Sequence, residues 1–129
     1  MINDSGLGFN INRDCDKYKC MGVGFIGIIM DFKLTVSLEI SDKVTNPKNN
    51  GIKSGYAPHH KFKNVDYLVS GYHKYEDDNF HYPGETVKAE ISFPSWEYFC
   101  KSVSVGEKFE VLELDRIIGY GVVESIELK

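Results

Sequence analysis

The stretch that decides the fold is Phe32-Lys33-Leu34-Thr35-Val36-Ser37-Leu38-Glu39-Ile40-Ser41, in which apolar and polar residues alternate without a break. Successive side chains of a β-strand point to opposite faces of a sheet, so the alternation predicts one buried and one solvated face. An amphipathic helix would instead repeat its apolar residues every three or four positions. The stretch therefore predicts a half-buried strand.

A second alternating stretch, residues 87–93, follows the turn signal Pro83-Gly84. Weaker strand patterns lie at residues 56–62, 65–75, 108–112 and 116–128. In the last of these the apolar spacing slips, and Gly119 and Gly121 would permit a β-bulge or a close backbone approach. Asn, Pro and Gly gather at 46–51, which predicts a loop.

Helical patterns are minor in this chain. No long window repeats its apolar residues with a helical period, and the one short candidate is a turn at residues 95–100. Regularly spaced strands separated by Gly, Pro and Asn favour a barrel or a sandwich, and closing a barrel removes exposed sheet edges. We predict an all-β domain.

Length and charge set the first limits on function. A chain of 129 residues has room for one compact core, and 42% apolar with 26% charged residues is ordinary for a globular protein. We expect a barrel domain at 32–129, with residues 1–31 as an extension that packs on or flanks it. A net charge of -4 argues against sequence-independent nucleic-acid binding, which needs many cations to displace phosphate counterions.

The cysteines and the apolar runs suggest a compartment. Three cysteines with no Cys-x-x-Cys pair fit neither a disulfide framework nor a zinc ribbon, so a reducing compartment is the simpler interpretation. The longest apolar run, Met21 to Met30, is about half of the roughly 20 residues that a membrane span needs. We expect a cytoplasmic protein without a signal peptide or a membrane anchor.

One motif resembles a nucleotide-binding loop. Gly22-Val23-Gly24-Phe25-Ile26-Gly27 matches Gly-x-Gly-x-x-Gly, whose glycines let a strand turn sharply into a helix that meets a pyrophosphate. Here the motif is followed by apolar residues and then by the strand at residue 32, not by a helix. We interpret the match as a coincidence and expect no bound nucleotide.

The histidines do not form a recognisable metal or catalytic motif. His59 and His60 are adjacent on an expected strand and would point to opposite faces, whereas an acidic turn separates His73 from His81. No Ser-His-Asp or Cys-His arrangement can be assigned, and Cys100 lies in an apolar stretch typical of a core. We expect no metal, no cofactor and no catalysis, although a small enzyme with a histidine-containing cleft remains an alternative.

Residues 55–63 interleave aromatic and basic side chains. Tyr56, His59, His60, Lys61 and Lys63 could contact phosphates and bases, because aromatic rings stack on bases and cations meet phosphates. The alternative is a strand whose aromatic residues belong to the core and whose lysines are merely solvated. The sequence leaves both interpretations open.

Four segments follow one another in an order known from a translation factor: Ser54-Gly55-Tyr56-Ala57-Pro58-His59-His60, Tyr82-Pro83-Gly84-Glu85-Thr86, Val87–Phe93 and Lys108–Val123. With these segments, the chain from about Leu34 onward resembles the C-terminal barrel domain of bacterial elongation factor Tu. The resemblance implies a closed six-stranded antiparallel Greek-key barrel.

The resemblance also brings expectations about partners. In the family this barrel helps to grip the T stem of aminoacyl-tRNA, packs on a GTPase domain and meets the exchange factor. The chain has no Gly-x-x-x-x-Gly-Lys-Ser/Thr motif, so we expect no nucleotide hydrolysis. Glu113 and Arg116 match the family, but Ala57 replaces an arginine, and Leu114 and Asp115 replace two glycines. Losing a guanidinium removes a bidentate phosphate contact.

We therefore predict a non-catalytic, stand-alone barrel that binds a macromolecule, a protein in preference to RNA. A toxin is one conceivable partner, which would make the chain an immunity or antitoxin protein. The candidate partner-binding residues are Tyr56, His59, His60, Lys61, Lys63, Glu113 and Arg116. The alternative is an RNA- or tRNA-binding accessory protein of translation, with affinity that falls steeply as salt rises.

Overall fold

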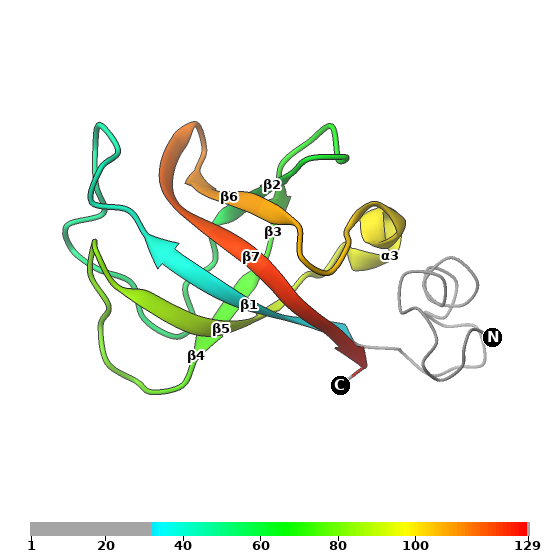
Figure 1. The fold of residues 1–129 in the computed structure, drawn as a ribbon, viewed down its shortest axis with the longest axis horizontal. Coiled ribbons are helices and arrows are strands. Elements are labelled where there is room, and N and C mark those ends of the chain that lie inside the picture. Colours follow the sequence, from blue (N-terminus) through cyan, green and yellow to red (C-terminus); the bar gives the residue numbers. More distant parts are fainter. Residues whose placement is uncertain (1–31, 129) are drawn as a thin grey trace.

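The computed structural model describes residues 32–128, and this part of the chain forms an antiparallel sheet of seven strands with one short helical segment (Figure 1). The strands are β1 (Phe32–Ile40), β2 (His59–Phe62), β3 (Val69–Ser70), β4 (Tyr72–Tyr75), β5 (Thr86–Ser92), β6 (Lys108–Glu113) and β7 (Arg116–Leu128). The helical segment comprises α3 (Trp96–Phe99) and the 3₁₀ turn η2 (Cys100–Ser102). The prediction of an all-β domain is confirmed.

The strands lie in the order β3-β2-β6-β7-β1-β5-β4, and every pair is antiparallel. The sheet is a curled half-barrel of seven strands, so the closed six-stranded barrel that the resemblance implied is wrong. The difference arises at Gly71, where the strand expected at 65–75 divides. β3 pairs with β2 and β4 pairs with β5, which are next to the two opposite ends of the sheet.

Glycine is required where the chain passes from β3 to β4. A Cβ atom at Gly71 would lie 2.8 Å from side-chain atoms of both Ile91 and Phe93. Contacts that short force a neighbour to move, and both neighbours belong to the packed core. The packing thus explains why residue 71 is a glycine.

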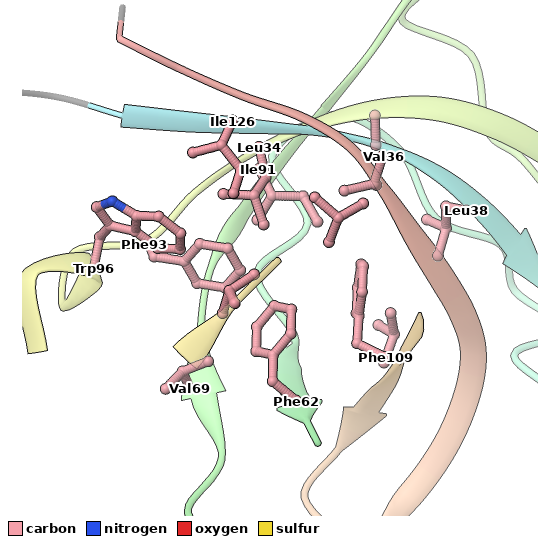
Figure 2. Close-up of a cluster of buried hydrophobic side chains, with 14 of the residues drawn as sticks. Leu34, Val36, Leu38, Phe62, Val69, Ile91, Phe93, Trp96, Phe109 and Ile126 are labelled. Carbon is pink, nitrogen blue, oxygen red and sulfur yellow. The ribbon is translucent and has the colours of Figure 1, made fainter. Parts of the chain in front are cut away.

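The core fills the concave side of the sheet (Figure 2). Leu34, Val36, Leu38 and Ile40 are buried, as the alternation in β1 predicts, while the residues between them are at least partly accessible. Side chains from the other strands and from α3 complete the cluster, among them Phe62, Ile91, Phe93, Trp96, Phe109 and Ile126. Cys100 is also fully buried, as expected for a core residue, but it is disulfide-bonded, which the expectation of a reducing compartment did not predict.

The slipped pattern in β7 marks a β-bulge. Thr35 pairs with Ser125 but Val36 pairs with Val123, which leaves Glu124 as the extra residue. The expected close approach is present as well, because a Cβ atom on Gly119 would collide with the Glu39 carbonyl oxygen, and one on Gly121 with the Phe109 ring. Both features predicted for this strand are confirmed.

Several expectations concern the rest of the chain. The proposed extension at 1–31, the glycine-rich motif at 22–27, Cys15 and Cys20 lie outside the described residues. Within 32–128, the segment 46–51 has no strand, as the loop prediction requires. No helix in this part of the chain is long and apolar enough to cross a membrane.

Candidate binding face

The side chains of neighbouring candidate residues in β2 point to opposite sides of the sheet. His60 and Phe62 are fully buried, whereas Lys61 is exposed between them and Lys63 is exposed just after the strand. His59 is only partly buried. The basic and aromatic residues at 55–63 therefore do not form one patch. Some of their side chains lie in the core and the others lie on the surface.

The inner structure is a chain of hydrogen bonds through two histidines. The Nε2 atoms of His60 and His73 lie 2.8 Å apart. Nδ1 of His60 lies 3.0 Å from the Val69 carbonyl oxygen, and Nδ1 of His73 lies 2.7 Å from the Tyr75 hydroxyl. The sequence suggested no such pairing, because thirteen residues separate the two histidines.

The Val69 carbonyl sets the direction of every hydrogen bond in this series. The Val69 oxygen can only accept, so Nδ1 of His60 donates, and Nε2 of neutral His60 must accept the N–H of His73. Nδ1 of neutral His73 then accepts the Tyr75 O–H. With both imidazoles neutral, each polar side-chain atom of this hydrogen-bonded series has a partner.

Burial keeps the imidazoles of His60 and His73 neutral. The pKa of His60 is lowered to about 4, chiefly by desolvation; the Val69 hydrogen bond opposes this shift and nearby His59 adds to it. Desolvation, with a smaller contribution from His60, lowers the pKa of His73 well below its ordinary value. His60, expected to contact a partner, cannot do so in this fold because it has no accessible surface.

Tyr56, Glu113 and Arg116 do come together, as a cluster at one end of β6 and β7. The Tyr56 hydroxyl donates to Oε2 of Glu113 at 2.7 Å, and Lys48 Nζ reaches the same oxygen at 2.7 Å. Arg116 Nη1 lies 3.2 Å from Oε1 of Glu113. Burial raises the pKa of Glu113, but the hydrogen bonds from Lys48 and Tyr56 outweigh it and hold that pKa below its usual value.

The guanidinium of Arg116 is directed toward the loop before β2. Its Nε donates to the Asn46 carbonyl at 3.0 Å, and its Nη2 donates to the Pro47 carbonyl at 2.9 Å. Together with Glu113, these contacts occupy three of its nitrogen atoms. Arg116 and Lys48 therefore fasten the loop to the sheet, a role that sequence reasoning missed because Lys48 lies in a turn-rich segment without a motif.

His59 lies near this cluster. Its Nδ1 accepts the backbone N–H of Leu114 at 3.3 Å, in the turn between β6 and β7. Leu114 has a φ of 58°, a left-handed conformation that disfavours branched side chains, and it is 71% exposed. The hydrogen bond supports that turn from the side.

Lys61 and Lys63 belong to a different neighbourhood, on the outer face of β2, β6 and β7. With Lys108 and Tyr120 they line a hollow of about 270 Å³, whose remaining lining comes from Phe62, Phe109 and Glu110. Tyr120 is 41% exposed. Sequence analysis found two of these lysines but not Lys108 or Tyr120, which come from strands more than forty residues away.

Two further hollows adjoin the first. Tyr120 also lines a hollow of about 440 Å³ with Lys43 and Arg116, and Lys63 and Lys108 also line one of about 530 Å³. We call the three hollows together the basic trough. Its charged members are Lys43, Lys61, Lys63, Lys108, Arg116, Glu107, Glu110 and Asp115.

Comparison with protein-family models and with curated proteins finds no match for this chain.

The trough is more basic than the protein as a whole. Its five cations face three carboxylates, although the chain carries a net charge of -4. Among the residues described, no ion pair involves the ammonium groups of Lys61, Lys63 or Lys108. Glu107 is already bonded, because it accepts the backbone N–H groups of Lys63 and Ser104 at 3.1 and 3.0 Å.

Proposed function

We propose that this protein is a non-catalytic binding module that holds a macromolecular partner, a protein in preference to RNA, on the basic trough. The observation that carries the proposal is the group of ammonium ions of Lys61, Lys63 and Lys108, which share one hollow and have no ion-pair partner among the described residues. Like charges placed together repel one another. A partner with negative charge would relieve that repulsion.

A protein partner is favoured because the residues that would serve RNA are engaged elsewhere. Tyr56 donates its hydroxyl to Glu113, and Arg116 contacts Glu113 and two loop carbonyls. Glu110 and Asp115 also line the trough and would repel a phosphate backbone, which is charged at every step, whereas a peptide can place uncharged residues opposite them. A protein surface can match a lining of mixed charge.

The likeness to the C-terminal barrel domain of elongation factor Tu is part of this proposal. The backbone geometry within the segment Lys108–Val123, which matches the family motif, supports this likeness. Gly119 and Gly121 meet neighbouring groups too closely for any side chain, and Leu114 adopts a left-handed φ where the family has glycine. We propose that the chain uses a related half-barrel to bind a different kind of partner.

The test compares two triple variants with the wild type. In the trough variant, K61E/K63E/K108E, three lysines of the trough are reversed. In the control variant, K53E/K74E/K101E, three exposed lysines outside the trough are reversed, so the net charge changes equally. Each purified protein is immobilised and exposed to extract from its source cells after RNase treatment, and the retained proteins are identified by mass spectrometry.

We expect a protein that the wild type and the control variant retain and the trough variant loses. Equal retention by all three would contradict the proposal. Binding of purified tRNA by the wild type that survives physiological salt and disappears in the trough variant would favour RNA instead.

A further inference from the structure

We infer that the basic trough receives an extended, acidic segment of the partner protein, with Lys61, Lys63 and Lys108 meeting its carboxylates. This inference rests on the proposed function and specifies the chemistry of the segment that the trough would recognise.

The strand register places the cations close together. Lys61 of β2 is opposite Glu110 of β6, and Glu110 is opposite Tyr120 of β7, so these three residues form one row across the outer face. Phe62 and Phe109 form the next pair, and their side chains point inward. Lys63 directly follows β2 and Lys108 begins β6, which brings two more ammonium groups to the same end of both strands.

The shape of the trough favours an extended occupant. The hollow of about 270 Å³ lies between the other two, because it shares Tyr120 with one and both Lys63 and Lys108 with the other, so the three form a continuous series. A compact ligand would occupy one hollow. An extended peptide advances about 3.3 Å per residue and can pass through successive hollows with side chains alternating toward and away from the surface.

The lining also favours carboxylates over a phosphate chain. Lysine offers a compact charge that a single carboxylate can satisfy, without the planar fork with which arginine grips phosphate. Tyr120 and Val105, which is 54% exposed, offer apolar contacts between the charged positions. An acidic segment with apolar residues at alternate positions matches this pattern.

The experiment uses a fluorescein-labelled octapeptide, Glu-Ala-Asp-Val-Glu-Ala-Asp-Val, whose binding is followed by fluorescence anisotropy at low ionic strength. We expect the wild type and K53E/K74E/K101E to bind it, and K61E/K63E/K108E to bind about thirtyfold more weakly, the combined effect of three partly exposed ion pairs. The peptide with Gln and Asn in place of Glu and Asp should not bind. Added salt should weaken the wild-type interaction.

Two results would overturn the inference. One is the absence of peptide binding to the wild type at low ionic strength, and the other is equal binding by both triple variants. If the trough variant has nevertheless lost a retained partner protein, the proposed function stands and only the acidic segment is wrong. A K61A/K63A/K108A variant, which must also bind more weakly, replaces the charge-reversed protein if the latter does not fold.

Discussion

His60 and Lys61 are consecutive residues of β2, yet the first has no accessible surface and the second is exposed. On the inner face, His60 finds all its hydrogen-bond partners within the protein and must remain uncharged. On the outer face, Lys61 has no ion-pair partner in the described part of the chain and stands beside two other lysines. The comparison indicates that one face of β2 supplies stability and the other is available for binding.

The largest effect should come from the inner face. Phe62 is fully buried, with its ring 4.9 Å from that of Phe109 and 5.8 Å from that of Phe93. We expect Phe62→Ala to lower the free energy of unfolding by about 3–5 kcal/mol, because it removes a buried ring and leaves a cavity. Urea denaturation measures this loss. Lys61→Ala should change stability by only about 0.5 kcal/mol, and an equal loss in both variants would contradict the comparison.

The second effect is the loss of stability in acid. His60 has a pKa of about 4 in the folded protein, whereas an unfolded histidine titrates near its ordinary value of about 6.5. Below pH 6.5 the unfolded chain binds more protons than the folded one, so the free energy of unfolding falls until the pH passes about 4. His60 alone accounts for about 2 kcal/mol between pH 7.5 and pH 5, and His73 adds to it.

Urea midpoints at pH 7.5 and pH 5 test this prediction. His81→Gln is the control, because contacts with Glu85 and Asp77 raise the pKa of His81, which is partly buried, and protonating it should stabilise the fold rather than weaken it. The acid loss should therefore persist in this variant. A stability that does not change between the two pH values would show that the buried histidines are not the neutral pair described above.

A smaller effect is expected at the cluster between the two faces. Tyr56→Phe removes the hydroxyl that donates to Glu113, but Lys48 and Arg116 still contact that carboxylate. We expect a loss of about 1 kcal/mol in the free energy of unfolding. Tyr72→Phe, at an exposed tyrosine of β4, should leave the denaturation curve unchanged. A loss near zero in both would mean that the cluster adds no stability.

The smallest effect on stability per site belongs to the outer face. Because Lys61, Lys63 and Lys108 make no ion pair within the described residues, K61E/K63E/K108E should change the free energy of unfolding by about 0.5 kcal/mol or less per site. Thermal unfolding followed by circular dichroism measures it. A large loss would place these lysines in the stabilising part of the molecule and would weaken the case for binding.

Much of the sheet could be predicted because its signal is local. The alternation at 32–41 gives the buried face of β1 directly, and the slipped pattern at 116–128 gives the bulge in β7. The break at Gly71 could not be predicted in the same way. Nor could the need for glycine there, which depends on Ile91 and Phe93, about twenty residues away in the chain and in contact only after folding.

The candidate site, too, was predictable only where its signal is local. The local pattern identified Tyr56, Lys61 and Lys63 as residues of interest, because interleaved aromatic and basic side chains stand out in a sequence, and the family resemblance added Glu113 and Arg116. Their roles were not visible there. Tyr56 and Arg116 both form hydrogen bonds with Glu113. Lys61 and Lys63 lie in a separate hollow, which Lys108 and Tyr120 also line.

The sequence by itself determined that the protein is built from β-strands and which side of β1 faces the core, because a period of two is a property of neighbouring residues. The tertiary structure alone decided that His60 meets His73, that Gly71 divides a strand and that lysines of β2 and β6 share one hollow. These features depend on strand register and sheet curvature, which arise from contacts between distant segments and leave no local pattern.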